Sequence, residues 1–121
     1  MPEPGKVELI VAQDHGGLNA GSFFIRNSEM MKLFVDLWSD PLIVEKTPSW
    51  VQREQQALTY LIERHPQLRE RVGYVDQRLI DGYVEGAGEW REGDLLVHFA
   101  GCWYAFRSCV RGLIVGLIRN V

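Results

Sequence analysis

The sequence predicts a layered domain of helices and strands, of the α/β or α+β class. Three observations support this: strand patterns come first, two amphipathic helix patterns follow, and further strand patterns come after the helices. The chain has 121 residues, which suits a single small domain. Its apolar content of 46% is typical of a globular protein and argues against a disordered chain.

The first strand and the segment after it carry different patterns. Residues 7–12 are mostly apolar and predict a short strand, and residues 22–26 are aromatic and β-branched and predict a second one. Residues 13–22 are rich in glycine and asparagine, which predicts a loop. That loop has neither the GxGxxG nor the Walker pattern, so an ordinary surface loop is as well supported as a phosphate-binding one.

Two amphipathic helices are predicted next. The first begins after the N-cap signal Asn27-Ser28 and ends before Pro41. Its apolar residues recur at helical spacing and are expected to face the core: Met30, Leu33, Phe34, Leu37 and Trp38.

Residues 42–46 are expected to connect the two helices. The second helix begins at Thr47-Pro48 and ends at His65-Pro66. Glu54 lies on its apolar stripe, either at the solvated edge or facing a polar cavity. The residues alone favour the solvated position.

The last part of the chain contains short strand candidates at 72–75 and 78–80, turn residues at 81–82 and a loop at 85–88. The run 95–103 follows a turn and predicts a buried strand. His98 is the polar ring within that run, and a buried imidazole must hydrogen-bond or bind a metal. Two interpretations stay open: a core histidine satisfied by a carbonyl, which is the commoner case, or a metal ligand, with Gly101 allowing close approach.

Several classes of protein are excluded by composition. The formal net charge is −3 without a block of lysine or arginine, which argues against nucleic-acid binding. Cys102 and Cys109 are too few for a disulfide scaffold or a cysteine zinc site. The first residues lack the apolar core of a signal peptide, and no stretch has the length of a spanning helix. No HExxH motif supports a metal hydrolase.

Three blocks in order carry a more specific signal. They are DHGGLNAGSF at 14–23, Trp50 with REQQAL at 53–58, and GDLLVHFAGCW at 93–103. Together they resemble glycosyltransferase family 34, which includes fungal α-1,2-galactosyltransferases, α-1,6-mannosyltransferases and plant xyloglucan xylosyltransferases. The resemblance implies the C-terminal portion of a GT-A fold, a mixed sheet with flanking helices, so residues 1–121 would form one partial glycosyltransferase domain.

The resemblance also implies an activity and its partners. The expected function is that of a retaining hexosyltransferase, which moves a sugar from UDP-galactose or GDP-mannose to a mannose-containing glycan with Mn²⁺ as the divalent metal. Its expected place is the lumenal side of the Golgi membrane, beside other glycosyltransferase subunits. The alternative is a non-catalytic fragment or an interaction subunit of such a complex.

Site residues follow from the same motifs. His98 matches the family's metal-binding histidine. Glu54 and Gln55 match the acidic-glutamine segment at the donor sugar and are the expected catalytic residues: Glu54 would orient hydroxyls or stabilise positive charge, and Gln55 would lie near the anomeric centre. The residues implied in donor binding are Asp14, His15, Leu18, Asn19, Ala20, Gly21 and Gly101.

The chain departs from the family pattern in one respect that matters for activity. It contains no Asp-x-Asp motif, which in the family precedes the first block by a segment that would come before Met1. We therefore expect the N-terminal nucleotide-binding half to be absent and the chain alone to be inactive. We also expect the isolated chain to be marginally stable, because its strands would leave an open apolar edge.

Overall fold

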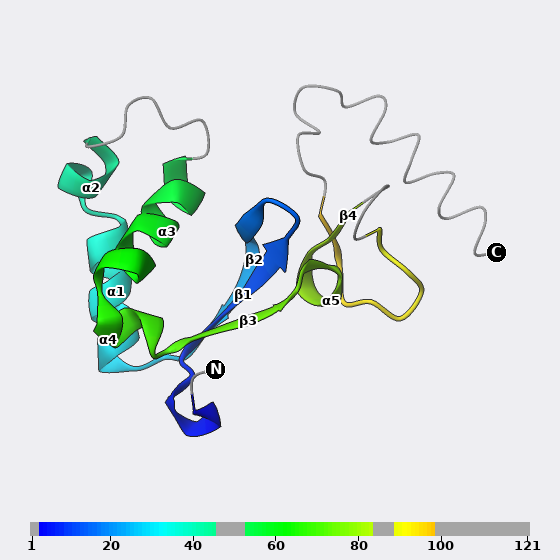
Figure 1. The fold of residues 1–121 in the computed structure, drawn as a ribbon, viewed down its shortest axis with the longest axis horizontal. Helices are drawn as coiled ribbons and strands as arrows, with labels where there is room; N and C mark the ends of the chain where they lie inside the picture. Colours follow the sequence, from blue (N-terminus) through cyan, green and yellow to red (C-terminus); the bar gives the residue numbers. More distant parts are fainter. Residues whose placement is uncertain (1–2, 46–52, 84–88, 99–121) are drawn as a thin grey trace.

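The computed structural model describes residues 3–45, 53–83 and 89–98, and Figure 1 shows their arrangement. The first half contains η1 (Pro4–Lys6), β1 (Leu9–Asp14), β2 (Gly17–Ile25), α1 (Glu29–Trp38) and α2 (Pro41–Glu45). The second half contains α3 (Arg53–Arg64), α4 (Pro66–Arg69), β3 (Val72–Asp76), α5 (Gln77–Asp81), β4 (Gly82–Tyr83) and β5 (Val97–His98). In the described ranges, the helices are all too short or too polar to cross a membrane.

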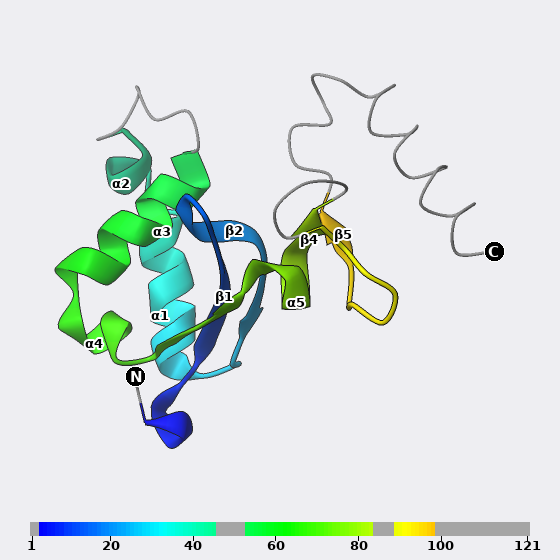
Figure 2. The same ribbon diagram turned by 45° about the vertical axis from the view of Figure 1, so that its right-hand side comes forward.

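The main sheet has the strand order β2-β1-β3. Strand β1 runs antiparallel to β2 and parallel to β3, so the sheet is mixed. Helices α1, α3 and α4 lie on one side of this sheet, whereas α5, β4 and β5 lie on the other (Figures 1 and 2). Strands β4 and β5 pair in parallel as a second, two-stranded sheet. The predicted α/β class, with a mixed sheet and flanking helices, is thereby confirmed.

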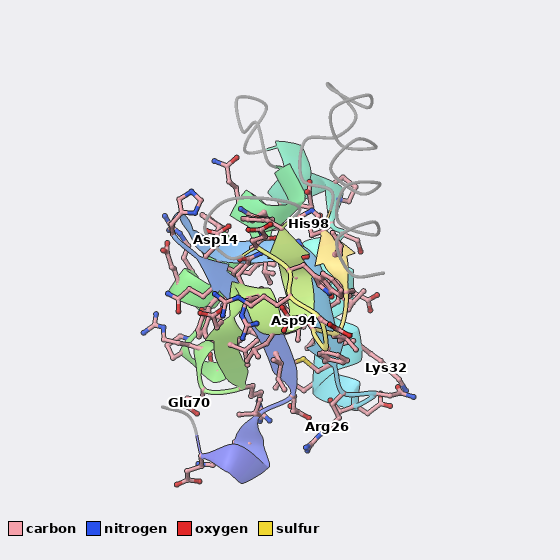
Figure 3. The ribbon with its side chains drawn as sticks, turned by 90° about the vertical axis from the view of Figure 1, so that its right-hand side faces the viewer. Asp14, Arg26, Lys32, Glu70, Asp94 and His98 are labelled. Atoms are coloured by element: carbon pink, nitrogen blue, oxygen red, sulfur yellow. The ribbon has the colours of Figure 1, made fainter. Side chains whose placement is uncertain are left out.

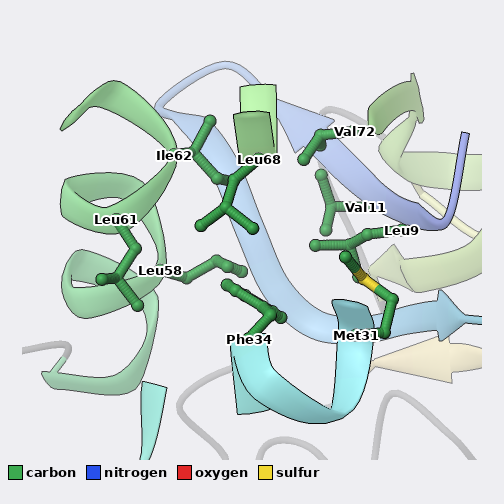
Figure 4. Packing of buried hydrophobic residues seen from close by; sticks show 9 residues of the cluster. All are labelled: Leu9, Val11, Met31, Phe34, Leu58, Leu61, Ile62, Leu68 and Val72. Atoms are coloured by element: carbon green, nitrogen blue, oxygen red, sulfur yellow. The ribbon is translucent and has the colours of Figure 1, made fainter. Parts of the chain in front are cut away.

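The core lies between the main sheet and the helices on one side of it. Leu9 and Val11 are two residues apart on β1, so both side chains point to the same face of the sheet, and both are almost fully buried. Val72 is paired with Leu9 in the parallel ladder and points to that face too. The buried cluster, drawn in Figure 4, consists of Leu9, Val11, Met31, Phe34, Leu58, Leu61, Ile62, Leu68 and Val72.

Helix α1 forms where the sequence predicts it, but it presents a slightly different face. The side chain of Ser28 accepts a hydrogen bond from the Met31 N–H at 3.2 Å, which confirms the predicted N-cap. Met31 and Phe34 are the buried residues of this helix, whereas Leu33 is 56% exposed. The predicted stripe was wrong at Leu33 and also at Leu37, which is exposed. Apolar residues occur nearly all round this helix, so spacing alone did not fix which side faces inward.

The predicted loop at 13–22 is mostly strand. The reversal between β1 and β2 is confined to a tight turn, in which Asp14 Oδ1 accepts the Gly16 N–H at 2.7 Å. Gly17 has a φ of 111°, which favours glycine, and β2 begins there. The loop prediction was wrong at residues 13–14, which end β1, and at residues 17–22, which lie in β2. Glycine and asparagine act here at one turn and at an irregularity within the strand.

Two other local predictions were wrong. Residues 42–45, most of the connector expected at 42–46, lie in the short helix α2 (Pro41–Glu45). Residues 78–80, expected as a strand, lie in α5, because the carboxylate of Asp76 accepts the Arg78 N–H and caps a helix.

The other boundaries agree with the sequence where they can be compared. Strand β3 and the end of α3 at Arg64 are confirmed. The predicted start at Thr47-Pro48, the loop 85–88, both cysteines and most of the run 95–103 lie outside the described residues. Of that run, Val97 and His98 form β5.

Core packing gives a first prediction. Phe34→Ala removes a 1% exposed ring from the cluster and should lower the free energy of unfolding by about 3–5 kcal/mol. Leu33→Ala, one residue earlier on the exposed face of α1, is the matched control and should change it by less than about 0.5 kcal/mol. Urea unfolding followed by circular dichroism measures both, and equal losses would contradict this assignment of the core face.

Candidate functional site

An irregularity in the pairing of β1 with β2 shapes the candidate site. Val11 pairs with Phe23, but the next residue, Ala12, pairs with Asn19. Residues 20–22 of β2 therefore have no partner on β1 and form a bulge. We call these three residues the β2 bulge. Bulges re-aim backbone and side chains locally, and side chains from distant parts of the chain converge on this one.

Asp14, at the end of β1, is the centre of a hydrogen-bond network. Its Oδ2 accepts the Tyr83 hydroxyl at 2.6 Å and the Asn19 side-chain amide at 3.0 Å. The Asn19 Nδ2 also lies 2.7 Å from the Tyr83 oxygen, and Asn19 Oδ1 accepts the Gly21 N–H at 2.8 Å. Asn19 is 6% exposed. The network thus links the end of β1 to the β2 bulge and to β4.

The network sets the protonation of both acidic groups in it. Burial acts to raise the pKa of Asp14, but hydrogen bonds from Tyr83, Asn19 and the Gly16 N–H hold that pKa below its usual range. Burial, followed by the neighbouring Asp14, raises the pKa of the Tyr83 hydroxyl well above its usual range. At neutral pH Asp14 is therefore a carboxylate and Tyr83 a hydrogen-bond donor.

Helix α3 reaches the β2 bulge through Gln55. Its Oε1 accepts the Ala20 N–H at 3.0 Å, so an acceptor from the first turn of α3 satisfies a backbone donor that the bulge leaves without a ladder partner. The neighbouring Glu54 side chain is exposed, and its backbone carbonyl accepts the indole N–H of Trp38 at 2.8 Å. The solvated position favoured for Glu54 is confirmed.

His98, on β5, lies against the other end of the bulge. Its Nδ1 is 2.9 Å from Asp81 Oδ2, and the imidazole side chain is 27% exposed whereas the Asp81 side chain is 1% exposed. Burial raises the pKa of the Asp81 carboxyl, and the adjacent His98 opposes that shift. The histidine ring is thus held by a carboxylate rather than by the carbonyl that a core histidine would use.

Gly21 is where the bulge and the imidazole meet. A Cβ atom on Gly21 would lie 2.4 Å from His98 Cε1 and 2.9 Å from Asp81 Oδ2. Both distances are shorter than van der Waals contact allows, so a neighbouring group would have to shift. The backbone of Gly21 is not in the left-handed region, since only Gly17 and Gly93 have positive φ among the described glycines. Glycine is therefore needed at position 21 for the space it leaves.

A hollow of about 470 Å³ adjoins Asp14 at the carboxyl ends of the parallel strands β1 and β3. It is lined by Gln13, Asp14, His15, Tyr74, Val75, Asp76 and Gln77. In open α/β sheets, ligands bind outside the carboxyl ends of parallel strands. Figure 3 shows Asp14 and His98 toward the same end of the molecule, with Glu70 and Arg26 toward the other.

Most of the residues expected in the site are brought together, and their roles stay predictions. Asp14, Asn19, Ala20, Gly21, Gln55 and His98 converge on the bulge. His15 is exposed and lines the hollow, while Leu18 packs against the hydrophobic core. Glu54 is exposed in the first turn of α3, and Gly101 lies outside the described residues.

Sequence reasoning missed Asp81 and Tyr83. The sequence indicated only a turn at Asp81-Gly82, and Tyr83 is 69 positions away from Asp14. The sequence offered a signal for Asp81 alone, because a carboxylate and a histidine on neighbouring segments commonly pair, so Asp81 could have been considered as a partner of His98. In the described ranges, no group of three or more His, Cys, Asp or Glu side chains is placed to hold a metal ion.

Fold and site together define an α/β protein with a polar, carboxylate- and amide-lined centre at the ends of parallel strands. The chain belongs to the galactosyl transferase GMA12/MNN10 family, whose profile matches residues 2–109. This confirms the resemblance to glycosyltransferase family 34. No solved structure matches the chain significantly.

Three yeast relatives illustrate the similarity. The chain is 48% identical over 97 residues to "Probable alpha-1,2-galactosyltransferase gmh2" of Schizosaccharomyces pombe, a match that covers 78% of this chain and 28% of the relative. It is 43% identical over 105 residues to an "Alpha-1,2-galactosyltransferase" of the same yeast, covering 85% and 27%. It is 40% identical over 116 residues to "Probable alpha-1,6-mannosyltransferase MNN10" of Saccharomyces cerevisiae, covering 86% and 29%. The chain therefore spans less than a third of each of these relatives.

The Asp14 network predicts how stability responds to Tyr83→Phe and to pH. Loss of the hydroxyl bond to a carboxylate should lower the free energy of unfolding by about 1.5–3 kcal/mol at neutral pH. The pKa of Asp14 is lower in the folded protein than in the unfolded chain. Its carboxylate therefore stabilises the fold above the pKa of the unfolded state, and this stabilisation is lost as the pH falls through the pKa of the folded state. The variant should therefore lose less stability than the wild type on acidification from pH 6 to pH 2.

Urea unfolding at several pH values measures this difference. Tyr74→Phe, at a tyrosine that is 45% exposed on β3, is the matched control and should follow the wild type within about 0.5 kcal/mol. Parallel acid profiles for wild type and Tyr83→Phe would contradict the assigned network.

Proposed function

We propose that this chain is part of a retaining hexosyltransferase of GT-A fold, which transfers galactose or mannose from a nucleotide-sugar to a mannose-containing glycan. Family membership and the galactosyl- and mannosyltransferase names of the relatives support the transfer of a hexose. The single structural observation that carries the proposal is the convergence of Gln55 and His98 on adjacent residues of the β2 bulge.

The geometry suggests where the donor sugar would lie. Gln55 is bonded to Ala20, and the His98 ring is packed on Gly21, so the two side chains flank one stretch of backbone. A polar sugar needs hydrogen-bonding groups held rigidly, which the links of the bulge to α3, β1 and β4 provide. Glu54, exposed in the same turn of α3, would contact sugar hydroxyls only from the rim of this site.

In this proposal, His98 is the residue of the described chain that would bind a divalent cation. With Nδ1 of His98 paired to Asp81, Nε2 is the ring nitrogen left for a ligand bond, and the ring is partly exposed. Oxygen atoms of a diphosphate and carboxylates are the other ligands that Mn²⁺ prefers, and the family's Asp-x-Asp carboxylates are not among these 121 residues. When bound, the cation would neutralise the charge of the leaving diphosphate. This chain's own part would be to hold His98 and the bulge in place.

The hollow beside Asp14 is suited to a sugar of the acceptor glycan. Its volume is within the usual range for ligand sites. Tyr74 offers an exposed ring on which the apolar face of a sugar can stack, and Asp76 and Gln13 offer planar polar groups for its hydroxyls. The hollow shares Asp14 and His15 with the expected donor wall, so an acceptor there would lie beside the donor.

The alternative is a non-catalytic fragment or an interaction subunit of a Golgi glycosyltransferase complex on the lumenal side of the membrane. One observation favours it: both oxygens of Asp14 and the amide of Asn19 are bonded within the protein, as in a structural network. Titration of the 121-residue chain with UDP-galactose or GDP-mannose and Mn²⁺ separates the two functions. Tight metal-dependent binding would contradict the non-catalytic one.

The metal role of His98 is tested by His98→Ala in the full-length protein. Loss of an imidazole ligand should reduce Mn²⁺-dependent sugar transfer by at least about 100-fold, since even supporting residues around a metal contribute 10–100-fold. His65→Ala, an exposed histidine before α4 whose side chain makes no capping bond, is the matched control and should leave transfer unchanged. Transfer rates across a Mn²⁺ titration are the measurement, and an unaltered Mn²⁺ dependence in His98→Ala would refute the role.

The acceptor hollow is tested by Tyr74→Ala. Loss of a stacking ring should raise KM for the glycan acceptor by about 2- to 10-fold while KM for the nucleotide-sugar changes little, because one ring-stacking contact contributes about 0.5–1.5 kcal/mol. Phe24→Ala removes a ring of similar exposure from β2, at the opposite edge of the sheet, and should change neither constant. Equal effects of the two variants would argue against acceptor binding in the hollow.

A further inference from the structure

We propose that Asp81 is a positioning residue, which holds His98 in the tautomer protonated at Nδ1 and so leaves Nε2 as the ligand atom. We further propose that Gly21 supplies the space that this ring orientation needs. The identity of the ligand, a metal–diphosphate complex, rests on the function proposed above. The orientation of the ring rests on the structure alone.

Asp81 is buried beside the imidazole of His98. Its side chain is 1% exposed, and its Oδ1 has no hydrogen-bond partner within the described part of the chain. Such a carboxylate is costly unless a charge or donor faces it. The contact that it does make is with His98 Nδ1 at 2.9 Å. An ionised carboxylate accepts rather than donates, so this contact favours the proton on Nδ1.

The backbone of Asp81 is also held in place. The Gln77 side chain, 3% exposed, donates to the Asp81 carbonyl across α5. Gly82, the next residue, has Trp90 Cα and the Leu96 carbonyl 3.1 and 3.2 Å from where its Cβ would be, so the segment leading to β5 is closely packed against it. Asp81 therefore approaches His98 from a fixed support. Metal-binding histidines usually donate their second N–H to such a group, which orients the ring.

Gly21 leaves room for the imidazole. The imidazole lies on its Cα, in the space that any other residue's Cβ would fill. Asp81 on one side and the β2 bulge on the other therefore restrict the ring to one orientation. Tyr83 adds a tilted ring contact, with centroids 5.8 Å apart.

The first test reads the tautomer directly, without metal or substrate. These 121 residues contain three histidines, so ¹⁵N-histidine labelling and long-range ¹H–¹⁵N NMR give few signals from them. The His98 signal is assigned by its loss in His98→Gln. We expect the Nδ1–H form in wild type and in Asp81→Asn, whose amide oxygen can still accept. We expect the Nε2–H form in Asp81→Leu, which has no acceptor.

The second test measures Mn²⁺ affinity in the full-length protein by the electron paramagnetic resonance signal of free Mn²⁺, in the presence of UDP or GDP. Asp81→Leu and Gly21→Ala should each weaken binding by about 10–100-fold, and Asp81→Asn should weaken it less. Glu8→Leu is the matched control, since it removes another carboxylate of a near-buried ion pair, with Arg71, away from His98. It should leave both the tautomer and the affinity unchanged.

The outcomes separate the two proposals. An Nε2–H tautomer in wild type, or an Nδ1–H tautomer that persists in Asp81→Leu, would overturn the positioning role. Wild-type affinity in Gly21→Ala would overturn the role of Gly21. If the tautomer responds as expected but wild type binds no Mn²⁺, the positioning role stands and the proposed metal-dependent function fails. Should Asp81→Leu not fold, the tautomer of the wild type still decides the positioning role, and Gly21→Ala still decides the role of Gly21.

Discussion

The candidate site depends on backbone donors that the β2 bulge removes from the sheet ladder. A buried N–H group needs an acceptor, so each extra residue of the bulge must be satisfied from elsewhere. Ala20 finds Gln55 on α3, and Gly21 finds the side chain of Asn19. The bulge therefore explains why α3, the β1–β2 hairpin and the β4–β5 sheet meet at one place. Its backbone N–H groups bond to side chains of α3 and β2, and the Cα of Gly21 is covered by His98 of β5.

Two carboxylates near the bulge are stabilised in different ways. Asp14 is surrounded by neutral donors, which keep it ionised without a cation. Asp81 faces a histidine and is otherwise buried. Each carboxylate raises the cost of charge on the other, since Asp14 acts to raise the pKa of Asp81.

The layered class, the first helix and the residues gathered at the site could be predicted because they depend on local patterns and on three ordered motifs. Register, helix phase and long-range partners could not. The face of α1 was ambiguous because apolar residues surround it, and the bulge was indistinguishable from a loop because both favour glycine and asparagine. Tyr83 and Asp81 lie in a segment that looks like a turn, and only the tertiary fold brings Tyr83 to Asp14 and places Asp81 beside the imidazole.

Helix α5 grips the segment before and within β5 at two points. Arg78 binds both carboxylate oxygens of Asp94, at 3.0 and 3.1 Å, and Asp81, one turn further on, binds His98. A separation of three positions on the helix is thus matched to a separation of four positions between Asp94 and His98. The number of residues between Asp94 and His98 is consequently fixed by these two contacts. Side chains between them can be exchanged, but inserting or deleting one residue would break either the Arg78–Asp94 or the Asp81–His98 contact.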